Sequence, residues 1–392
     1  MKILTITSLF PNRIDPKHGI FVETRLKHLK AQYPDIVQTV IAPVPWFPFT
    51  SERFGAYGRF AKVPRTDQRN GAQIHHPRYL VIPKIGMLFT PFTMALSILL
   101  CLFKLRRQGF EYDLIDGHYL YPDGVAIALC QLFLKRPFVL TARGSDLNLI
   151  SKTTIPRRMI RWSCCKSEQL ITVCEALRQT AIEIGISPSH ITTLRNGVDL
   201  ELFSPPTDRQ ALRNQLRFEQ STLLSAGNLI ELKGHHLIIE ALQKLANVQL
   251  YIAGDGPDLD KLEQLSRTLG VKDRVHFLGR LSQTELCQYY GAADALVLAS
   301  SREGWANVLL EVMACGTPVI ATRVGGTPEV IQNAQVGRLI MRNIDELVLA
   351  INGVLGDQLD RHDVRRYAEQ FDWQASSKGQ RDLFKRILTD AH

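Results

Sequence analysis

The chain has few cysteines, and none of their spacings is one that binds metal or forms a disulfide framework. Seven cysteines occur in 392 residues. Apart from the neighbours Cys164 and Cys165 they stand singly, which is typical of a reducing compartment. The first eight residues also lack the basic-then-apolar layout of a signal peptide. We therefore expect a cytoplasmic protein.

Motifs for metals, dinucleotides and nucleic acids are missing too. No Asp-x-Asp pair or His/Asp cluster appears where a diphosphate-bound metal would be held, so we expect no metal and no bound cofactor. The loop Ala253-Gly-Asp-Gly-Pro257 departs from the Gly-x-Gly-x-x-Gly dinucleotide motif, because Leu259 stands where its last glycine would be. No nucleic-acid recognition pattern is present, and nucleic acid is not an expected partner.

Positive charge is concentrated in the first half of the chain. Residues 1–200 hold 26 Lys and Arg against 14 Asp and Glu, whereas the remainder holds 21 against 24. A basic half beside a mildly acidic half indicates that one domain meets an anionic partner. A phosphorylated substrate or an anionic membrane surface fits this pattern.

One uncharged stretch, Ile85–Phe103, approaches the length of a membrane span and ends in Lys104, Arg106 and Arg107. Pro91 interrupts it, and a strand candidate follows in a regular α/β rhythm, which favours a core helix over a membrane span. A basic, apolar helix lying on a membrane surface is the third alternative.

Short apolar strand candidates alternate with helix-length segments, which predicts parallel sheets built from βαβ units. The first series of strands is predicted at Lys2–Ser8, Ile36–Pro43, Gln73–Ile82, Tyr112–Asp116, Phe138–Thr141, Gln169–Val173 and Ile191–Leu194. The second is predicted at Leu223–Ala226, Val248–Ala253, Val275–Leu278, Ala295–Leu298, Pro318–Ala321 and Gly337–Ile340. The turn-rich segment Arg195–Pro206 separates them. Arg361–Leu388 is predicted to be wholly helical.

These patterns predict two doubly wound α/β domains, at residues 1–200 and 201–370, followed by a terminal segment at 371–392. In open α/β sheets the ligand loops follow the carboxyl ends of the strands. We therefore expect the two domains to face a central cleft that holds a ligand with two halves.

The most specific segment for chemistry is Ser300–Glu329. A strand ends at Leu298, a loop carries Glu303, and a helix is expected to start near Asn307, where free amides and the helix dipole favour an anion. Glu303 and Glu311 lie eight residues apart, roughly 12 Å along a helical path. That exceeds the separation of about 5–9.5 Å in a glycosidase carboxylate pair. The two carboxylates are better placed to hold opposite ends of an elongated ligand, although either one alone would be read as a solvated surface residue.

Two other loops of the second domain follow strands. Lys233 stands in Ala226–His235 at the start of a helix, where its ammonium can meet phosphate oxygens. Gly254 and Gly256 mark a tight turn where backbone can approach a ligand. Taken singly, Lys233 would be read as a surface lysine and the glycines as a plain turn.

In the first domain, four residues follow strand ends in the same way. Gly19 precedes a helix and can let backbone approach a phosphate. His118 can orient a sugar or an acceptor hydroxyl, or serve as a hydrogen-bonded structural histidine. Arg143 and Asp146 can contact an anionic or polyhydroxyl acceptor, or pair with each other.

Together these residues resemble glycosyltransferase family 4, with the GT-B fold, over essentially the whole chain. The resemblance rests on Glu303–Glu311 as a Glu-x7-Glu motif, on Gly316–Ala321, on Gly325–Glu329, and on Asn196–Asp199 with Phe203. Ser8–Pro11, His18–Glu23 and Gly227–Leu229 look most like bacterial polysaccharide-assembly members, the TuaC-like proteins.

The resemblance implies a role for each matching residue. Glu303 would contact the donor sugar hydroxyls, Glu311 the ribose, and His118 the sugar, while the backbone near Arg280 and Leu281 would meet the base. Lys233 and the amides of Asn307, Val308 and Leu309 would hold the diphosphate. Asn228 stands where many members have arginine, which leaves the leaving group one fixed positive charge short. The terminal helix from Phe371 onward would cross back to the first domain.

The sequence thus predicts a retaining, metal-independent glycosyltransferase of bacterial surface polysaccharide synthesis. Its donor would be a nucleoside-diphosphate sugar, and its acceptor a glycan or a polyprenyl-diphosphate-linked glycan at the cytoplasmic membrane face. A sugar-nucleotide epimerase of the same architecture and a catalytically inactive binding protein are the alternatives. Donor turnover and product identity separate the three.

Overall fold

The computed structural model describes residues 1–81, 86–357 and 359–390, apart from the side chain of residue 52. The chain divides into two compact units. Unit 1 comprises Met1–Asn196 with Trp373–His392, and unit 2 comprises Gly197–Asp372. The divisions fall a few residues from those drawn on the sequence at 200 and 370. The C-terminal helix belongs to unit 1, as the expected return crossing requires.

Unit 1 is built on an eight-stranded sheet in the order β10-β9-β8-β7-β1-β2-β5-β4. Its strands are β1 Lys2–Ile6, β2 Val37–Ile41, β4 Thr66–Arg69, β5 Ala72–His75, β7 Leu114–His118, β8 Phe138–Ala142, β9 Gln169–Thr172 and β10 Ile191–Thr193, and β3 Val44–Pro45 pairs separately with β6 Arg78–Tyr79. Its helices are α1 Ile20–Gln32, α2 Gly55–Lys62, α3 Gly86–Arg107, α4 Val125–Leu134, α5 Ser145–Asn148, α6 Thr154–Lys166, α7 Glu175–Glu183 and α16 Trp373–Asp390.

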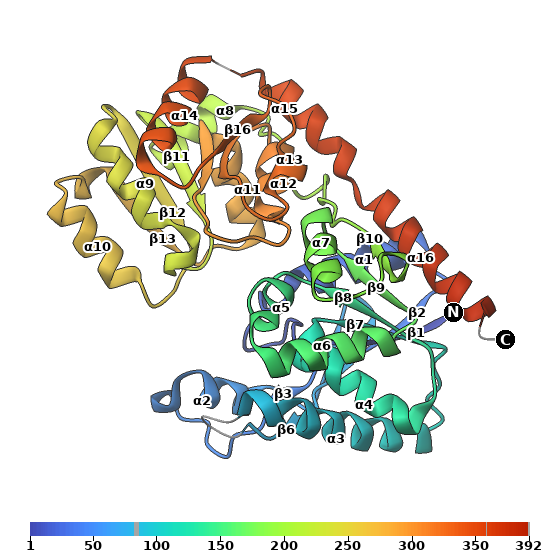
Figure 1. Cartoon of the computed structure of the whole chain (residues 1–392). Coiled ribbons are helices and arrows are strands. Elements are labelled where there is room, and N and C mark those ends of the chain that lie inside the picture. The colour runs from blue at the N-terminus through green and yellow to red at the C-terminus, as the bar shows by residue number, and fades with distance from the viewer. Residues whose placement is uncertain (82–85, 358, 391–392) are drawn as a thin grey trace. The chain divides into compact units, whose positions relative to one another are not determined.

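Helices cover both faces of the unit 1 sheet. On one face α1 packs on α16, and Phe384 of α16 joins a buried cluster with Ile3 and Leu29. On the opposite face lie α3 and α4, which pack on each other (Figure 1). All strand pairs in this sheet are parallel except β4 with β5. The carboxyl ends of the parallel strands therefore share one edge.

Unit 2 has a six-stranded, wholly parallel sheet in the order β13-β12-β11-β14-β15-β16. Its strands are β11 Ser221–Ala226, β12 Val248–Ala253, β13 Val275–Gly279, β14 Ala295–Leu298, β15 Val319–Thr322 and β16 Gly337–Ile340. Its helices are α8 Arg209–Leu216, α9 His235–Ala241, α10 Leu259–Thr268, α11 Gln283–Ala292, α12 Asn307–Ala314, α13 Thr327–Val330, α14 Ile344–Asp357 and α15 Arg361–Ala368. This is the second doubly wound domain that the sequence predicted.

Two segments differ from the sequence-based predictions. The strand expected at Gln73–Ile82 is two short strands, β5 and β6, in different sheets; Ile82 lies outside the described residues. The helix expected over Arg361–Leu388 is interrupted between α15 and α16, where the Phe371 carbonyl instead accepts a bond of 2.9 Å from the Val198 amide. This pairing joins the two chain segments that connect the units, so the helix cannot run through it.

Helix α3 corresponds to the uncharged stretch Ile85–Phe103, whose first residue lies outside the described part of the chain. By length and composition alone it is long enough to cross a membrane, yet 39% of its apolar window is buried within the protein. Met94, Ile98 and Leu102 are fully buried. The side of α3 that carries these three residues is a core helix face, as expected. The opposite side carries exposed apolar side chains and is not part of the core.

Candidate active site

Glycines pack four loops together at the carboxyl edge of the unit 2 sheet. A Cβ on Gly254, after β12, would lie 1.8 Å from the carbonyl oxygen of Gly227, after β11. A Cβ on Gly325, after β15, would lie 1.9 Å from the Glu303 carbonyl oxygen, after β14. Backbones approach this closely only where the side chain is absent. The sequence-predicted loops around Asn228, Gly254 and Glu303 are thereby neighbours.

Lys233 and Glu303 meet at the centre of these loops. The Lys233 Nζ donates to Glu303 Oε1 at 2.7 Å, and the Ser300 hydroxyl donates to the same oxygen at 2.7 Å. Both charged side chains are largely buried, at 22% and 11% exposure. Gly234 sets this geometry, because its φ of +71° and its contact with the Ala299 carbonyl require glycine. The lysine and the first glutamate of the Glu-x7-Glu motif thus occupy one site.

Helix α12 begins directly after this loop and carries Glu311. The amides of Asn307 and Leu309 donate to the carbonyls of Trp305 and Ala306 at 3.1 and 3.0 Å. The Tyr290 hydroxyl donates to Glu311 Oε2 at 3.3 Å. Desolvation raises the Glu311 pKa to about 7. This carboxyl can therefore hold or release a proton near neutral pH, which suits a group that exchanges hydrogen bonds with hydroxyls.

Two further predicted residues border the same loops. Arg280, after β13, pairs with Asp255 of the Gly254–Gly256 turn, with 3.3 Å between Nε and Oδ2. Leu281 follows it and is partly buried. Asn228 is exposed, and its carbonyl lies 3.3 Å from the His235 Nε2. The structure thus gathers all the donor-binding residues predicted in the second domain around one edge of one sheet.

His118, the predicted catalytic histidine of the first domain, has no exposed surface. Its Nδ1 accepts from the Arg143 guanidinium, and its Nε2 lies 3.1 Å from Asp116 Oδ2. Because arginine can only donate, the ring proton must sit on Nε2 and point at Asp116. Desolvation lowers the His118 pKa to about 4, so the ring is neutral at pH 7. Both ring nitrogens are bonded within the protein, as expected if His118 is a hydrogen-bonded structural histidine. Contact of His118 with a sugar stays a prediction.

A buried network holds this histidine in place. Gln380 of α16 donates to Asp116 Oδ2 at 3.0 Å and accepts from Arg25 Nε at 2.8 Å. Arg25 is 1% exposed, and desolvation lowers its pKa to about 10. The C-terminal helix therefore reaches the carboxyl end of β7 through a hydrogen-bonded pair rather than through apolar packing alone.

Asp146 and Gly19 serve the local backbone. Asp146 is fully buried, and its oxygens accept from the amides of Leu120, Arg143, Gly144 and Leu147 at 2.8–3.2 Å. These backbone bonds occupy the Asp146 carboxylate, and its contact with an acceptor stays a prediction. A Cβ on Gly19 would lie 2.2 Å from the Leu9 carbonyl. This close packing against the Leu9 backbone is enough to require a glycine at position 19, and approach of its backbone to a phosphate stays a prediction.

Two residues that organise these loops had no role in the sequence-based predictions. His235 lies between Ser225 Oγ at 2.9 Å and the Asn228 carbonyl, and desolvation lowers its pKa to about 4. Asp123 is fully buried and accepts from the Ser8 hydroxyl at 2.9 Å and from the Ser8 amide. Both stand inside segments singled out for other residues, His235 beside Lys233 and Asp123 in the loop after His118. Their position in the segments that lead from β11 into α9 and from β7 to α4 was the available signal.

Comparison with known proteins gives matches over most of the chain. Residues 59–202 match the family model described as Glycosyltransferase Family 4, and residues 208–371 match Glycosyl transferases group 1. The protein assigned as teichuronic acid biosynthesis glycosyltransferase TuaC of Bacillus subtilis is 29% identical over 335 residues, covering 83% of this chain and 82% of that protein. N-acetyl-alpha-D-glucosaminyl L-malate synthase of Bacillus anthracis is 28% identical over 64% of this chain and 66% of its own length, slightly under two thirds.

Solved structures extend the likeness to the whole fold. The Anabaena protein HepE in complex with UDP-glucose superposes with a TM-score of 0.75 at 22% identity, covering 98% of this chain and all of that one. At this identity the likeness concerns the arrangement of the backbone. The two doubly wound units and the returning α16 thus follow an architecture already seen in solved structures.

Proposed function

The chain belongs to the family 4 glycosyltransferases of GT-B fold, and from this premise we propose that it is a retaining, metal-independent hexosyltransferase using a nucleoside-diphosphate sugar. The observation that supports this most directly is the meeting of Lys233 and Glu303 beside the start of α12. A cation and a helix N-terminus suit a diphosphate, and a carboxylate suits sugar hydroxyls.

In the proposed donor complex, Lys233 turns from Glu303 to the diphosphate, and Glu303 turns to the sugar hydroxyls. The negative charge on the diphosphate grows as the bond to the sugar breaks. Lys233 and the positive end of the α12 dipole then stabilise the transition state more than the bound donor, which raises the rate. Glu311 accepts from the ribose hydroxyls, and the backbone at Arg280 and Leu281 faces the base. Because Asn228 is uncharged, Lys233 is the side chain proposed to stabilise the negative charge on the diphosphate.

The proposed reaction needs no protein nucleophile. The bond between the anomeric carbon and the phosphate oxygen breaks, and its electron pair leaves with the diphosphate. The acceptor hydroxyl forms the new bond on the same face of the sugar, and its proton passes to a departing phosphate oxygen. His118 of unit 1 is neutral at pH 7 and both its ring nitrogens are bonded within that unit, so it is not assigned that proton.

The relatives guide the choice of substrates. UDP-glucose is the first donor to test because HepE binds it. A glycan or lipid-linked glycan of surface polysaccharide synthesis is the proposed acceptor, because a relative is assigned to teichuronic acid synthesis. The excess of positive charge in the first half of the chain also favours peripheral association with the cytoplasmic face of the membrane.

A panel of nucleotide sugars tests the proposal. A donor that binds only the native protein raises its melting temperature. That donor, incubated with EDTA and a glycan acceptor, should give a product whose anomeric configuration matches the donor's by NMR. Inversion, loss of turnover with EDTA, or conversion of the donor to another nucleotide sugar would each refute one part of it.

A further inference from the structure

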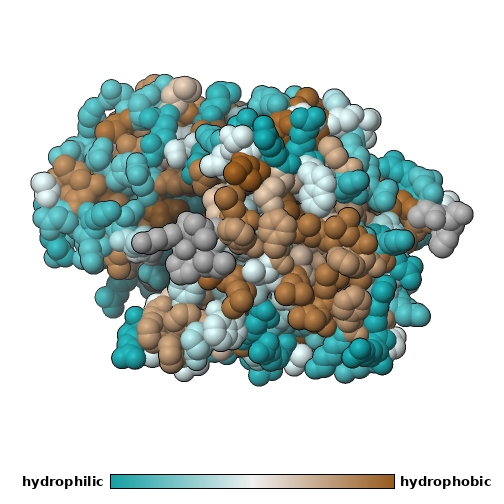
Figure 2. Space-filling model, turned by 60° about the horizontal axis from the view of Figure 1, so that its bottom comes forward, coloured by the Kyte–Doolittle hydropathy of each residue, from teal (hydrophilic) through white to brown (hydrophobic). Residues whose placement is uncertain are grey.

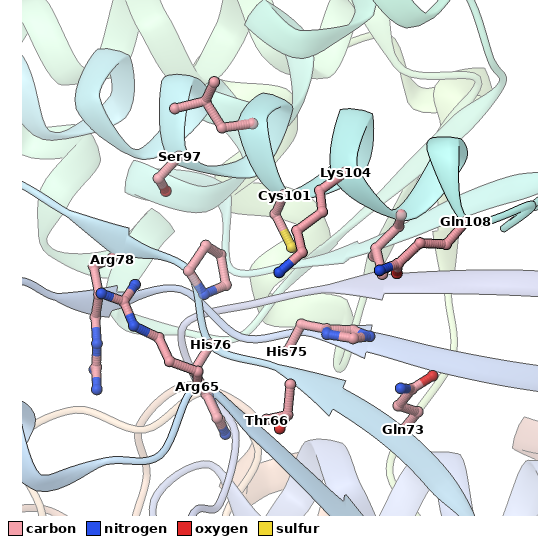
Figure 3. Close-up of a pocket in the computed structure, with 13 residues that line it drawn as sticks. Arg65, Thr66, Gln73, His75, His76, Arg78, Ser97, Cys101, Lys104 and Gln108 are labelled. Atoms are coloured by element: carbon pink, nitrogen blue, oxygen red, sulfur yellow. The ribbon is translucent and has the colours of Figure 1, made fainter.

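A second cavity lies in unit 1, outside the loops described above. It has a volume of about 580 Å³ and lies between α3 and the strands β4 and β5 with the start of β6. Its lining is formed by Arg65, Thr66, Gln73, His75, His76, Pro77, Arg78, Ser97, Leu100, Cys101, Lys104, Leu105 and Gln108. Figure 3 shows Lys104 extending from α3 toward the strand that carries His75.

The lining is cationic. Its charged side chains are Arg65, Arg78 and Lys104, and in the described part of the chain no carboxylate lines the cavity. Lys104 lowers the pKa of His75, after the larger effect of desolvation, and Arg65 likewise lowers that of Arg78. These positive charges are therefore close enough to feel one another. Asp67, the nearest acid on β4, is paired with Arg13 at 3.1 Å.

Two buried histidines line this cavity. His75 and His76 are 8% and 1% exposed, and the Nε2 of each lacks a hydrogen-bond partner among the described residues. The Nδ1 of His76 donates to the Ala42 carbonyl at 3.0 Å, so its neutral ring leaves Nε2 as an acceptor. His75 can direct an N–H at an acceptor oxygen of a ligand, which recovers the free energy that an unpaired buried nitrogen costs. Arg78 already donates to the Phe60 carbonyl at 3.1 Å. Lys104 and Arg65 are therefore the cations we expect to donate to a ligand.

An apolar stripe runs along α3 beside the cavity. Phe89, Phe92, Leu96, Leu100 and Phe103 recur every three or four residues, which places them on one side of the helix, and they are 45–62% exposed. Figure 2 shows hydrophobic side chains gathered on this face. Leu100 belongs to both the stripe and the cavity, and Lys104 follows it by one turn. The apolar and the cationic surfaces are therefore continuous.

We propose that this surface binds an anionic phospholipid bilayer, with the stripe of α3 among the acyl chains and the phosphate of one headgroup in the cavity, held by Lys104, Arg65 and His75. An apolar helix face rimmed by lysine and arginine is the arrangement by which proteins lie in a membrane interface. A free phosphorylated solute would use the cations but would leave the adjoining stripe exposed to water. The lipid accounts for both surfaces.

Co-sedimentation with vesicles tests the proposal without donor or acceptor, so its outcome is independent of the transfer reaction. The wild-type protein should bind vesicles of phosphatidylcholine with phosphatidylglycerol much more tightly than vesicles of phosphatidylcholine alone. Lys104→Gln should weaken binding to the anionic vesicles by about fivefold, the effect of one lysine near such a surface. Leu96→Gln should weaken binding by about tenfold or more, because it removes apolar burial.

Matched substitutions elsewhere on the protein test whether binding depends on this surface or only on total charge and exposed apolar area. Lys261→Gln on α10 removes another exposed lysine, and Leu349→Gln on α14 removes a leucine that is 74% exposed. Both should bind like wild type. Circular dichroism and melting temperature establish that each variant is folded.

Three results would overturn the proposal. The first is no binding of wild type to anionic vesicles. The second is equal loss of binding in Lys104→Gln and Lys261→Gln. The third is a rise in melting temperature with inorganic phosphate that depends on Lys104 while vesicles do not bind, because the cavity would then serve a soluble phosphate.

Discussion

Lys233 Nζ lies 2.7 Å from Glu303 Oε1, so the cation expected to hold the donor's diphosphate is neutralised by the carboxylate expected to hold its sugar. The pair keeps two largely buried charges satisfied while no ligand is bound. Donor binding must separate them, because each side chain then serves a different part of one molecule. Phosphate oxygens and sugar hydroxyls would replace the bond that both lose.

The first prediction concerns Lys233→Ala. We expect kcat to fall about 10²- to 10³-fold, because the substitution removes a positive charge placed where negative charge develops. The free energy of unfolding should fall by about 1–3 kcal/mol, because the largely buried Glu303 carboxylate loses its cation while Ser300 still donates to it. Steady-state kinetics and chemical denaturation measure the two effects.

The matched control is Lys244→Ala. Lys244 pairs with Asp345 at 2.6 Å in the same unit, but this pair is exposed and remote from the loops at the sheet edge. Its kcat should equal that of wild type. Near-wild-type turnover by Lys233→Ala would remove the lysine from the proposed mechanism.

The second prediction concerns Gly254→Ala. An added Cβ would overlap the Gly227 carbonyl, and the backbone φ of +152° disfavours any side chain. We expect the Gly227–Leu229 loop to be displaced, with at least about 2 kcal/mol of lost stability and no donor-induced rise in melting temperature. Gly353→Ala in α14 meets no atom within 4 Å and should stabilise by about 0.5–1 kcal/mol. Equal behaviour of the two variants would contradict the packing argument.

Much of the fold was predictable because buried parallel strands appear in the sequence as continuous apolar runs. The run Val248–Ala253 predicts β12 residue for residue. Strand β4, Thr66–Arg69, was missed because it is a polar edge strand, and edge strands need not bury either face. The exposed side of α3 was missed for the opposite reason, because periodicity is invisible in a helix that is apolar all round.

The candidate site was predictable where chemistry and backbone coincide in one motif, as in Glu303 and the start of α12. It was less predictable where partners are distant in sequence. Asp116 and Gln380 are 264 residues apart, and no local pattern links them. The sequence placed His118 after its strand but could not tell that Asp116 and Arg143 occupy both its nitrogens.

The third prediction concerns Gln380→Leu. This substitution removes one of the two donors to Asp116 Oδ2, the other being His118 Nε2, and it leaves Arg25 Nε without its acceptor, both in a fully buried place. We expect the free energy of unfolding to fall by about 2–5 kcal/mol, the cost of unpaired buried polar groups. Gln32→Leu on α1 loses one exposed bond to Tyr33 and should cost under about 0.5 kcal/mol. Denaturation curves that do not separate the two variants would show that the network contributes little.

The fourth prediction concerns the pH dependence of stability at Asp123. Desolvation raises the pKa of this buried carboxyl to about 7, from about 4 for an aspartate in the unfolded chain. The native state therefore holds a proton that the unfolded chain has released between these values, so this residue's contribution to stability falls as pH rises from about 4 to 7, by up to about 1.4 kcal/mol per pH unit. Asp123→Asn removes that dependence while keeping an oxygen acceptor for Ser8. The free energy of unfolding of the variant, minus that of wild type, should increase from pH 5 to 7 and stay constant above pH 8. Asp35→Asn, at an exposed aspartate of the same unit, is the matched control. A flat difference for Asp123→Asn would mean that its carboxyl is ionised in the folded protein throughout.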